Sequence, residues 1–347
     1  MKKFLTVLLI VACVSAFAEY KMIVPQKQDG GAATWAQVVA RELEKKLGEP
    51  VILEYIPGAN DVPGFNKWHN ELRFNNKTIM VGNGGPAEQF LIGHVDFDYK
   101  YYSPIGLQNL SITVGHKTNT DPYQHVQFGF VSGTNPDIMA ITLLVCGPKN
   151  TLAEYKTCYN EKIKYVKGFT NNERRLAYLR GELNVTRETP AAYIKVYSSM
   201  TDNVDWFAHG VMDLKSGNVI PDANFPGISF KQVYLKKWKV EPTGELYNAY
   251  LLVKGYRDVL QKTLWVNKGN PNTEKLRNAL RAVVADPVSR AAIEQDTGKY
   301  EWIIGDDVNT AMKQLNKITT KKALKDLVWW SNQVLGITAT YKDDIAH

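Results

Sequence analysis

The sequence has few cysteines and no internal apolar run long enough to cross a membrane. Three of its 347 residues are cysteines. No C-x-x-C pair occurs, so neither a zinc site nor a thioredoxin-type site is indicated. Beyond the first residues, no stretch approaches the roughly 20 apolar residues that a membrane helix needs. We therefore expect a mature protein that is soluble, of a length that suits two domains.

The motifs of several common enzyme classes are also missing. There is no G-x-x-x-x-G-K-[ST] phosphate-binding loop and no H-E-x-x-H, and the six histidines form no close ligand pair. The stretch Gly129-x-x-Ser132-Gly133 lacks the glycine spacing of a nucleophile elbow. We expect no enzyme, no cofactor and no metal site. An exported hydrolase of unknown type remains the weaker alternative.

The charge balance is mildly basic. Lysine and arginine total 42 against 35 acidic residues, a net charge of +7. Removal of Lys2 and Lys3 with a leader leaves 40 − 35 = +5. Basic runs such as Lys236–Lys239 are short and lack interleaved aromatic residues, so they argue against nucleic-acid binding. A positive balance suits an acidic small ligand.

The first 18 residues have the pattern of an export signal. Lys2-Lys3 precedes the apolar run Phe4–Ala12, and Ala16-Phe17-Ala18 is a small-x-small cleavage site. This pattern predicts a signal peptide over residues 1–18 and a periplasmic protein. The alternative is cleavage before Cys13, within a stretch that resembles a lipoprotein box, which would leave a lipid-anchored protein.

Two cysteines remain after the predicted cleavage, Cys146 and Cys158. In an oxidising compartment they can pair, and Gly147-Pro148 offers a turn that would bring them together. Two free buried thiols are an equal alternative.

Strands and helices are predicted to alternate along the chain. A strand over Tyr20–Val24 is followed by a helical apolar stripe over Thr34–Leu47. This β-α-β order predicts mostly parallel sheets flanked by helices. The further strands predicted are Val51–Tyr55, Lys77–Val81, Gln127–Val131, Lys162–Val166 and Glu182–Val185, and the further helices are Gly64–Leu72, Pro86–Ile92, Ile138–Val145, Asn172–Arg180, Asn272–Val284, Pro287–Gln295 and helices within Lys313–Gln333.

Three glycine-bearing loops are predicted at the ends of the first three strands. They are Gly30-Gly31, Pro57–Asn60 and Gly82–Gly85. In open α/β sheets ligands bind beyond the carboxyl ends of the strands, so these loops would share one rim. Each loop is also explained as a plain turn. Glycine lets backbone N–H groups approach an anion, and a helix N-terminus favours negative charge.

Several of these stretches together resemble the tripartite tricarboxylate transporter receptors, the Bug-type periplasmic binding proteins. The resemblance rests on motifs that occur in the family's order: Ile23-Val24-Pro25 before Gly30-Gly31, Leu47-Gly48-x-Pro50-Val51, Glu54-x-x-Pro57-Gly58-Ala59, Asn83–Pro86, Tyr102–Leu107 and Ala285-Asp286-Pro287-x-x-Arg290. It covers residues 20–110 and 260–310 well and residues 111–260 poorly.

The resemblance implies a two-lobed type II binding protein of the α/β class, with a hinge and a central cleft. One discontinuous lobe would comprise residues 19–106 and 265–347, and the other residues 107–264. The protein would be a monomer that captures a small carboxylated ligand and delivers it to membrane permease subunits. The alternatives are a sensing module for a membrane histidine kinase and an orphan binding protein without a permease.

The ligand-binding residues that this comparison implies come from five segments of the chain. They are Gln26, Gly30, Gly31, Ala32, Ala33, Thr34, Asn83, Gly84, Gly85, Ser132, Gly133, Thr134, Asn135, Lys167, Gly168 and Glu188. Ser132–Asn135 is equally explained as a helix cap. For Glu188 a structural hydrogen bond is the favoured alternative. The lead-in Gln26–Asp29 departs from the family pattern, and Asp29 adds a negative charge where an anion should bind.

Overall fold

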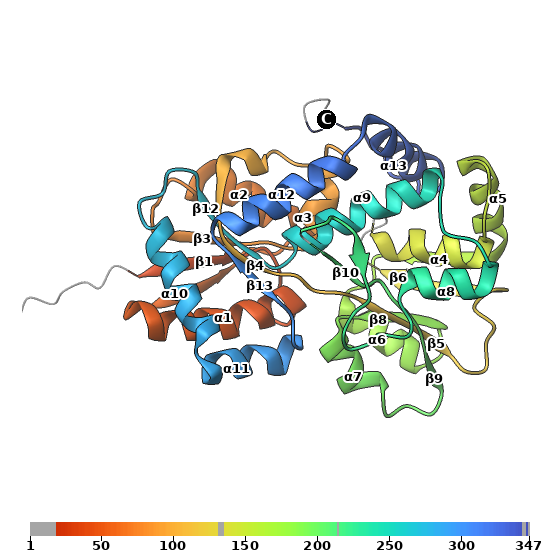
Figure 1. Cartoon of the computed structure of the whole chain (residues 1–347), viewed down its shortest axis with the longest axis horizontal. Coiled ribbons are helices and arrows are strands. Elements are labelled where there is room, and N and C mark those ends of the chain that lie inside the picture. Colours follow the sequence, from red (N-terminus) through yellow and green to blue (C-terminus); the bar gives the residue numbers. More distant parts are fainter. Residues whose placement is uncertain (1–18, 131–134, 214, 342–344, 346–347) are drawn as a thin grey trace, which may run out of the picture.

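The computed structural model describes residues 19–130, 135–213, 215–341 and Ile345. Its helices and strands form two lobes (Figure 1), one containing β1 to β4 and the other containing β5 to β9. The two-lobed α/β fold expected from the sequence is confirmed. In the described residues no helix combines the length and the apolar character needed to cross a membrane.

The first lobe is built on a six-stranded mixed sheet with the order β13-β4-β12-β3-β1-β2. Strand β1 pairs in parallel with β2 and with β3, as the sequence predicts. Strands β12, β4 and β13 pair antiparallel to their neighbours, so the sheet is less parallel than expected. The strand bounds are β1 Tyr20–Val24, β2 Val51–Tyr55, β3 Thr78–Val81, β4 Tyr102–Gln108, β12 Thr263–Asn267 and β13 Trp302–Ile304.

Helices cover both faces of this sheet because its central strands are apolar on both sides. Tyr20, Met22 and Val24 of β1 pack into one cluster with α1, α10 and α11. Ile23 points to the other face, into a cluster that includes residues of α2, α3 and α12. The helices of this lobe are α1 Gly31–Leu47, η1 Ala59–Asp61, α2 Val62–Lys67, η2 Trp68–Leu72, α3 Gly84–Leu91, η3 Tyr99–Tyr101, α10 Thr273–Ala285, α11 Pro287–Thr297 and α12 Asp306–Ile318.

The second lobe contains an antiparallel sheet, β8-β5-β9, and a parallel pair, β6-β7. Helix α4 is buried along its whole length. The strands are β5 Thr113–Lys117, β6 Val126–Phe130, β7 Ile163–Lys167, β8 Val185–Glu188, β9 Asn203–Ala208, β10 Val211–Met212 and β11 Val219–Ile220. The helices are α4 Pro136–Cys146, α5 Leu152–Lys162, α6 Asn171–Leu179, α7 Pro190–Tyr197 and α8 Phe230–Trp238.

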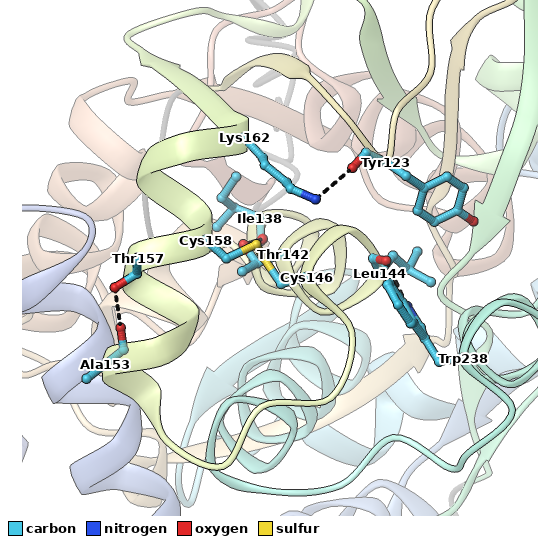
Figure 2. The surroundings of a disulfide bond; sticks show 10 residues. All are labelled: Tyr123, Ile138, Thr142, Leu144, Cys146, Ala153, Thr157, Cys158, Lys162 and Trp238. Atoms are coloured by element: carbon cyan, nitrogen blue, oxygen red, sulfur yellow. Dashed lines mark hydrogen bonds between the residues drawn. A yellow bond between two sulfur atoms is a disulfide. The ribbon is translucent and has the colours of Figure 1, made fainter.

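Cys146 and Cys158, whose pairing the sequence left undecided, form a disulfide bond. Cys146 ends α4 and Cys158 lies in α5, with their Cα atoms 6.0 Å apart. Figure 2 shows the bond joining the two helices, with Trp238 close to the end of α4. The Trp238 indole N–H donates to the Leu144 carbonyl at 2.9 Å. The disulfide therefore ties α5 to the buried helix of the second lobe.

Helix α9 (Glu245–Leu260) connects the lobes, and α13 (Lys321–Gln333) packs against it. Helix α9 contacts α3 and α12 of the first lobe and α4 of the second. Figure 1 shows α13 beside α9 and α5, away from the first sheet. The apolar cluster that holds these helices is continuous from Ile23 in the first lobe to Trp330 in α13.

Candidate ligand-binding cleft

Two adjoining cavities of about 480 Å³ and 260 Å³ lie between the lobes. Their walls come from the loop after β1, the loop after β3, the start of α6, strand β8 and helix α9. The residues that line both cavities are Gln26, Asp29, Asn83, Asn171, Asn172, Arg187 and Arg257. We treat the two cavities as one cleft.

The glycine pair Gly30-Gly31 stands at the start of α1, and the chain itself uses part of this helix terminus. The Gln26 side-chain oxygen accepts a hydrogen bond from the Ala32 N–H at 2.8 Å. A Cβ atom at Gly30 would lie 2.1 Å from that oxygen, so any larger residue here would force the Gln26 side chain to move. The Gly31 carbonyl accepts from the Lys262 ammonium at 2.7 Å. The expected anion site at this helix is therefore partly occupied by protein groups.

Asp61 joins the first three loops of the rim. Its Oδ2 atom accepts from the Asn83 amide at 2.6 Å and from the Gln26 amide at 3.3 Å. Burial raises the pKa of Asp61 to about 7, and the negative charge of Glu88 adds to this effect. Burial lowers the pKa of Lys262 to about 7, and the positive charge of Arg257 acts in the same direction. The cleft thus holds an acid and a base that both titrate near neutral pH.

Arg187 brings a buried guanidinium to the cleft from β8. Its Nε donates to Asp137 Oδ2 at 2.9 Å, and its side chain is 4% exposed. Among the described residues, the Nη2 atom has no hydrogen-bond partner. Burial lowers the pKa of Arg187 to about 10, while Asp137 opposes the shift, so the guanidinium is charged at neutral pH.

Arg257 contributes a second guanidinium from α9. Its Nη1 donates to Glu88 Oε1 at 2.6 Å, which links α9 to α3 of the first lobe. Its Nε is buried and finds no partner within the described part of the chain. Phe130 lies against both guanidiniums, with ring-centroid distances of 4.6 Å to Arg187 and 5.9 Å to Arg257. Two cations and an aromatic ring form one wall.

Asp29 forms a direct hydrogen bond across the cleft. Its Oδ2 accepts from the Asn172 side-chain amide at 3.0 Å. Asp29 precedes α1 in the first lobe and Asn172 lies in α6 of the second. The negative charge that looked unsuited to an anion site is therefore engaged by the opposite lobe.

Some of the predicted site residues line the cleft, and others lie elsewhere in the structure. Eight of them line the cleft: Gln26, Gly30, Gly31, Ala32, Thr34, Asn83, Gly85 and Glu188. The Glu188 Oε1 atom also accepts from Arg174 at 2.8 Å and from Arg175 at 3.0 Å, which is the structural role favoured as the alternative. A Cβ at Gly84 would lie 3.1 Å from Arg257 Nε, so that position borders the same wall.

Other predicted site residues lie away from the two cavities. Ala33 is buried in the core beside β1. Lys167 contacts the Leu335 carbonyl and, with Gly168, lines a separate cavity of about 370 Å³. Asn135 caps α4 through the Ile138 N–H at 3.2 Å. Ser132, Gly133 and Thr134 lie outside the described residues.

The most distinctive cleft residues were missed by the sequence reasoning. The predicted strand Glu182–Val185 ends where β8 begins, so Arg187 fell in an expected loop. No helix was predicted around Arg257. Asp61 directly follows the predicted turn Pro57–Asn60, and its position beside that turn was the available signal. In the part of the chain that the structure describes, no cluster of three or more metal-ligating side chains occurs.

The similarity of this chain to known proteins lies in its fold. No protein-family model matches the chain, and no curated protein matches its sequence. Solved structures do match. A TctC solute-binding protein from Polaromonas is 17% identical, with a TM-score of 0.55 and coverage of 89% of this chain and 98% of that one. The periplasmic binding protein BugD is 14% identical, with a TM-score of 0.58 and coverage of 90% and 97%.

The chain has the fold of these periplasmic binding proteins. MatC from Rhodopseudomonas palustris, solved with bound malate, is a third example. It is 12% identical, with a TM-score of 0.58 and coverage of 89% of this chain and 99% of that one. The resemblance to Bug-type receptors, which the sequence showed over residues 20–110 and 260–310, is thus confirmed at the level of fold, over nearly the whole of the matched chains.

Proposed function

We propose that this protein is an extracytoplasmic solute-binding receptor for a small carboxylated metabolite. It captures the ligand between its lobes and delivers it, without turnover, to a tripartite tricarboxylate-type membrane permease. The observation that carries the proposal is the interlobe cleft, with two buried guanidiniums on one wall. A cleft that presents buried guanidiniums with unpaired donors among other polar groups is the kind of site that binds a carboxylate.

The fold supports the same conclusion. Proteins of this fold include MatC, solved with malate, and an R. palustris protein solved with adipate. We assign residues 19–106 and 265–347 to one lobe and residues 107–264 to the other, and we infer export through residues 1–18 to the periplasm. Mass spectrometry of the mature N-terminus distinguishes cleavage after Ala18 from lipidation of Cys13.

Thermal-shift screening followed by calorimetry tests the proposal. Malate, adipate and citrate serve as probes, with the uncharged dimethyl ester of adipate as the matched control. We expect at least one carboxylate to stabilise the protein, by about 2.7 kcal/mol at a hundredfold excess over its Kd, and the ester to have no effect. If the protein binds no carboxylate of a broad panel, the proposal is wrong.

A further inference from the structure

We propose that Arg187 anchors the ligand carboxylate through Nη2, with Nε of Arg257 as the second donor. This inference rests on the proposed function and names the residues that select the ligand's charge. Both atoms are buried without a hydrogen-bond partner among the described residues, and both side chains line the cleft. Leaving such donors unpaired is costly, and a bound carboxylate would pair them.

Arg187 is held in place by a buried polar chain. Asp137, which is completely buried, accepts from Arg187 Nε through Oδ2, and its Oδ1 lies 2.9 Å from His209 Nε2. The other ring nitrogen of His209 lies 3.0 Å from the Tyr250 hydroxyl. The side chains of Tyr250, His209 and Asp137 thus hold the guanidinium from the core side, and its second edge is left for the cleft.

The ionisable side chains of this hydrogen-bonded network each have one charge state at neutral pH. Burial alone would raise the pKa of Asp137, but the positive charge of Arg187 and the His209 hydrogen bond outweigh it, so the pKa is lowered. Burial lowers the pKa of His209, against the effect of Asp137, so the imidazole is neutral. One carboxylate therefore faces one guanidinium, and the positive charge of Arg257 nearby has only Glu88 as its ion-pair partner among the described residues.

The wall around Phe130 explains why an anion would bind between the two arginines. The guanidiniums of Arg187 and Arg257 both lie within 6 Å of the same ring centroid, at 4.6 Å and 5.9 Å. The positive charge of Arg257 lowers the pKa of Arg187, so the two guanidiniums are close enough to repel each other. A carboxylate placed between them would neutralise the repulsion and accept two charge-assisted hydrogen bonds.

The helix terminus expected to bind the anion is less suited to it. The Ala32 N–H already donates to Gln26, and the Asp61 carboxyl lies beside Gln26. An anion that bound the Ala32 N–H would have to displace the Gln26 oxygen, whereas Arg187 Nη2 has no acceptor to lose among the described residues. The ligand carboxylate therefore belongs on the wall formed by the second lobe and α9.

Substitution of Arg187 by lysine tests the assignment without removing the charge that balances Asp137. We expect Arg187→Lys to weaken binding of malate or adipate roughly 10- to 100-fold, the range for a lost hydrogen bond to a charged group. The matched control is Arg277→Lys. Arg277 is likewise buried and ion-paired, with Glu274 at 2.6 Å, but it lies in α10 of the first lobe and lines neither cavity of the cleft. We expect this control variant to bind the same carboxylate with an affinity within about threefold of that of the wild type.

The outcomes separate this inference from the proposed function. If the wild type binds a carboxylate and Arg187→Lys binds it equally well, only the Arg187 assignment is overturned. The same holds if Arg277→Lys loses as much affinity as Arg187→Lys. If the wild type binds no carboxylate, both proposals fail. Urea unfolding of each variant establishes that the folded protein is being titrated.

Asp137 acts through Arg187 as a positioning residue, and a conservative variant tests this role. Asp137→Ala removes the acceptor of Arg187 Nε, and we expect an affinity loss similar to that of Arg187→Lys. Asp137→Asn keeps an oxygen for Arg187, and its amide can donate to the neutral His209 ring. We expect this variant to restore affinity to within about fivefold of the wild type. Unchanged affinity in Asp137→Ala, or no rescue by Asp137→Asn, contradicts the role.

Discussion

Asp61 and Lys262 show how burial sets the charge of individual residues in the cleft. Each side chain has a pKa of about 7, because removal from water disfavours the charged form of either group. Each also feels the other's charge, which opposes the shift. Neither residue carries a sequence motif, so their ionisation is a property of the folded molecule.

The raised pKa of Asp61 predicts a pH-dependent stability. Between its ordinary pKa of 3.8 and about 7, the folded state binds more protons than the unfolded state, so the free energy of unfolding falls as the pH rises through this window. Asp61→Asn should remove roughly 1 to 3 kcal/mol of that fall, since one pKa unit corresponds to about 1.4 kcal/mol. Urea unfolding at pH 5 and pH 7 measures it.

The control for Asp61 is Asp307→Asn, at an exposed position in α12. We expect this variant to keep the wild-type difference between the two pH values. An Asp61→Asn protein with the same pH dependence as the wild type would contradict the assignment.

At the scale of elements, sequence periodicity located the helices that have one buried face, α1, α10 and α11, within a few residues. Strand β1, which is buried on both faces, was predicted with its observed bounds from its short apolar run. Helix α9 was missed because it is buried on most sides and carries Lys254, Arg257 and Asp258 in its interior, so it shows no amphipathic stripe. Strand β8 was predicted three residues early, since its position depends on pairing with β5.

The start of α1 provides a prediction about the glycine pair. Gly30→Ala would place a Cβ atom 2.1 Å from the Gln26 side chain, so we expect a loss of about 1 to 3 kcal/mol of stability as Gln26 leaves the Ala32 N–H. At Gly31 no heavy atom lies within 4 Å of the corresponding Cβ. Gly31→Ala should stay within about 0.5 kcal/mol of the wild type. Equal stabilities of the two variants in urea unfolding would refute this account.

The disulfide between α4 and α5 provides a second prediction for this scale. The bond closes a loop with a sequence separation of 12 residues. The double variant Cys146→Ser and Cys158→Ser should lose about 3 kcal/mol, since the unfolded chain regains the entropy that the loop removed. Guanidinium unfolding of the oxidised wild type, the reduced wild type and the variant measures the effect. The reduced wild type should match the variant, and three coincident curves would show that the bond contributes nothing.

At the scale of the whole molecule, contacts between distant segments join the lobes. Arg257 of α9 pairs with Glu88 of α3, Asp29 bonds Asn172, and α13 packs on α9. The boundaries of the lobes after Gly106 and after Leu264 stay a prediction, and we expect the hinge to lie at these two crossings. A ligand bound between Arg187 and the first lobe would favour the closed arrangement.

The Asp29–Asn172 hydrogen bond predicts a change in the equilibrium between open and closed forms. Asn172→Ala removes an exposed bond worth about 0.5 to 1.5 kcal/mol, which corresponds to a two- to tenfold shift toward the open form. Small-angle scattering without ligand should show a larger radius of gyration. Arg180→Ala, which breaks an exposed ion pair within the second lobe, is the control and should leave the radius unchanged. Identical scattering from both variants would show that the bond does not hold the lobes together.

The order of motifs around Gly30-Gly31, Pro57–Asn60 and Asn83–Gly85 determined the fold and the position of the rim, because turns and strand ends are encoded locally. The anion-binding side of the cleft was decided by tertiary structure alone. Gln26 folds back onto the α1 terminus, and a buried chain through Asp137 leaves Arg187 facing the cavity. Which guanidinium N–H donors remain without an acceptor depends on contacts between residues far apart in the chain, and no local pattern records them.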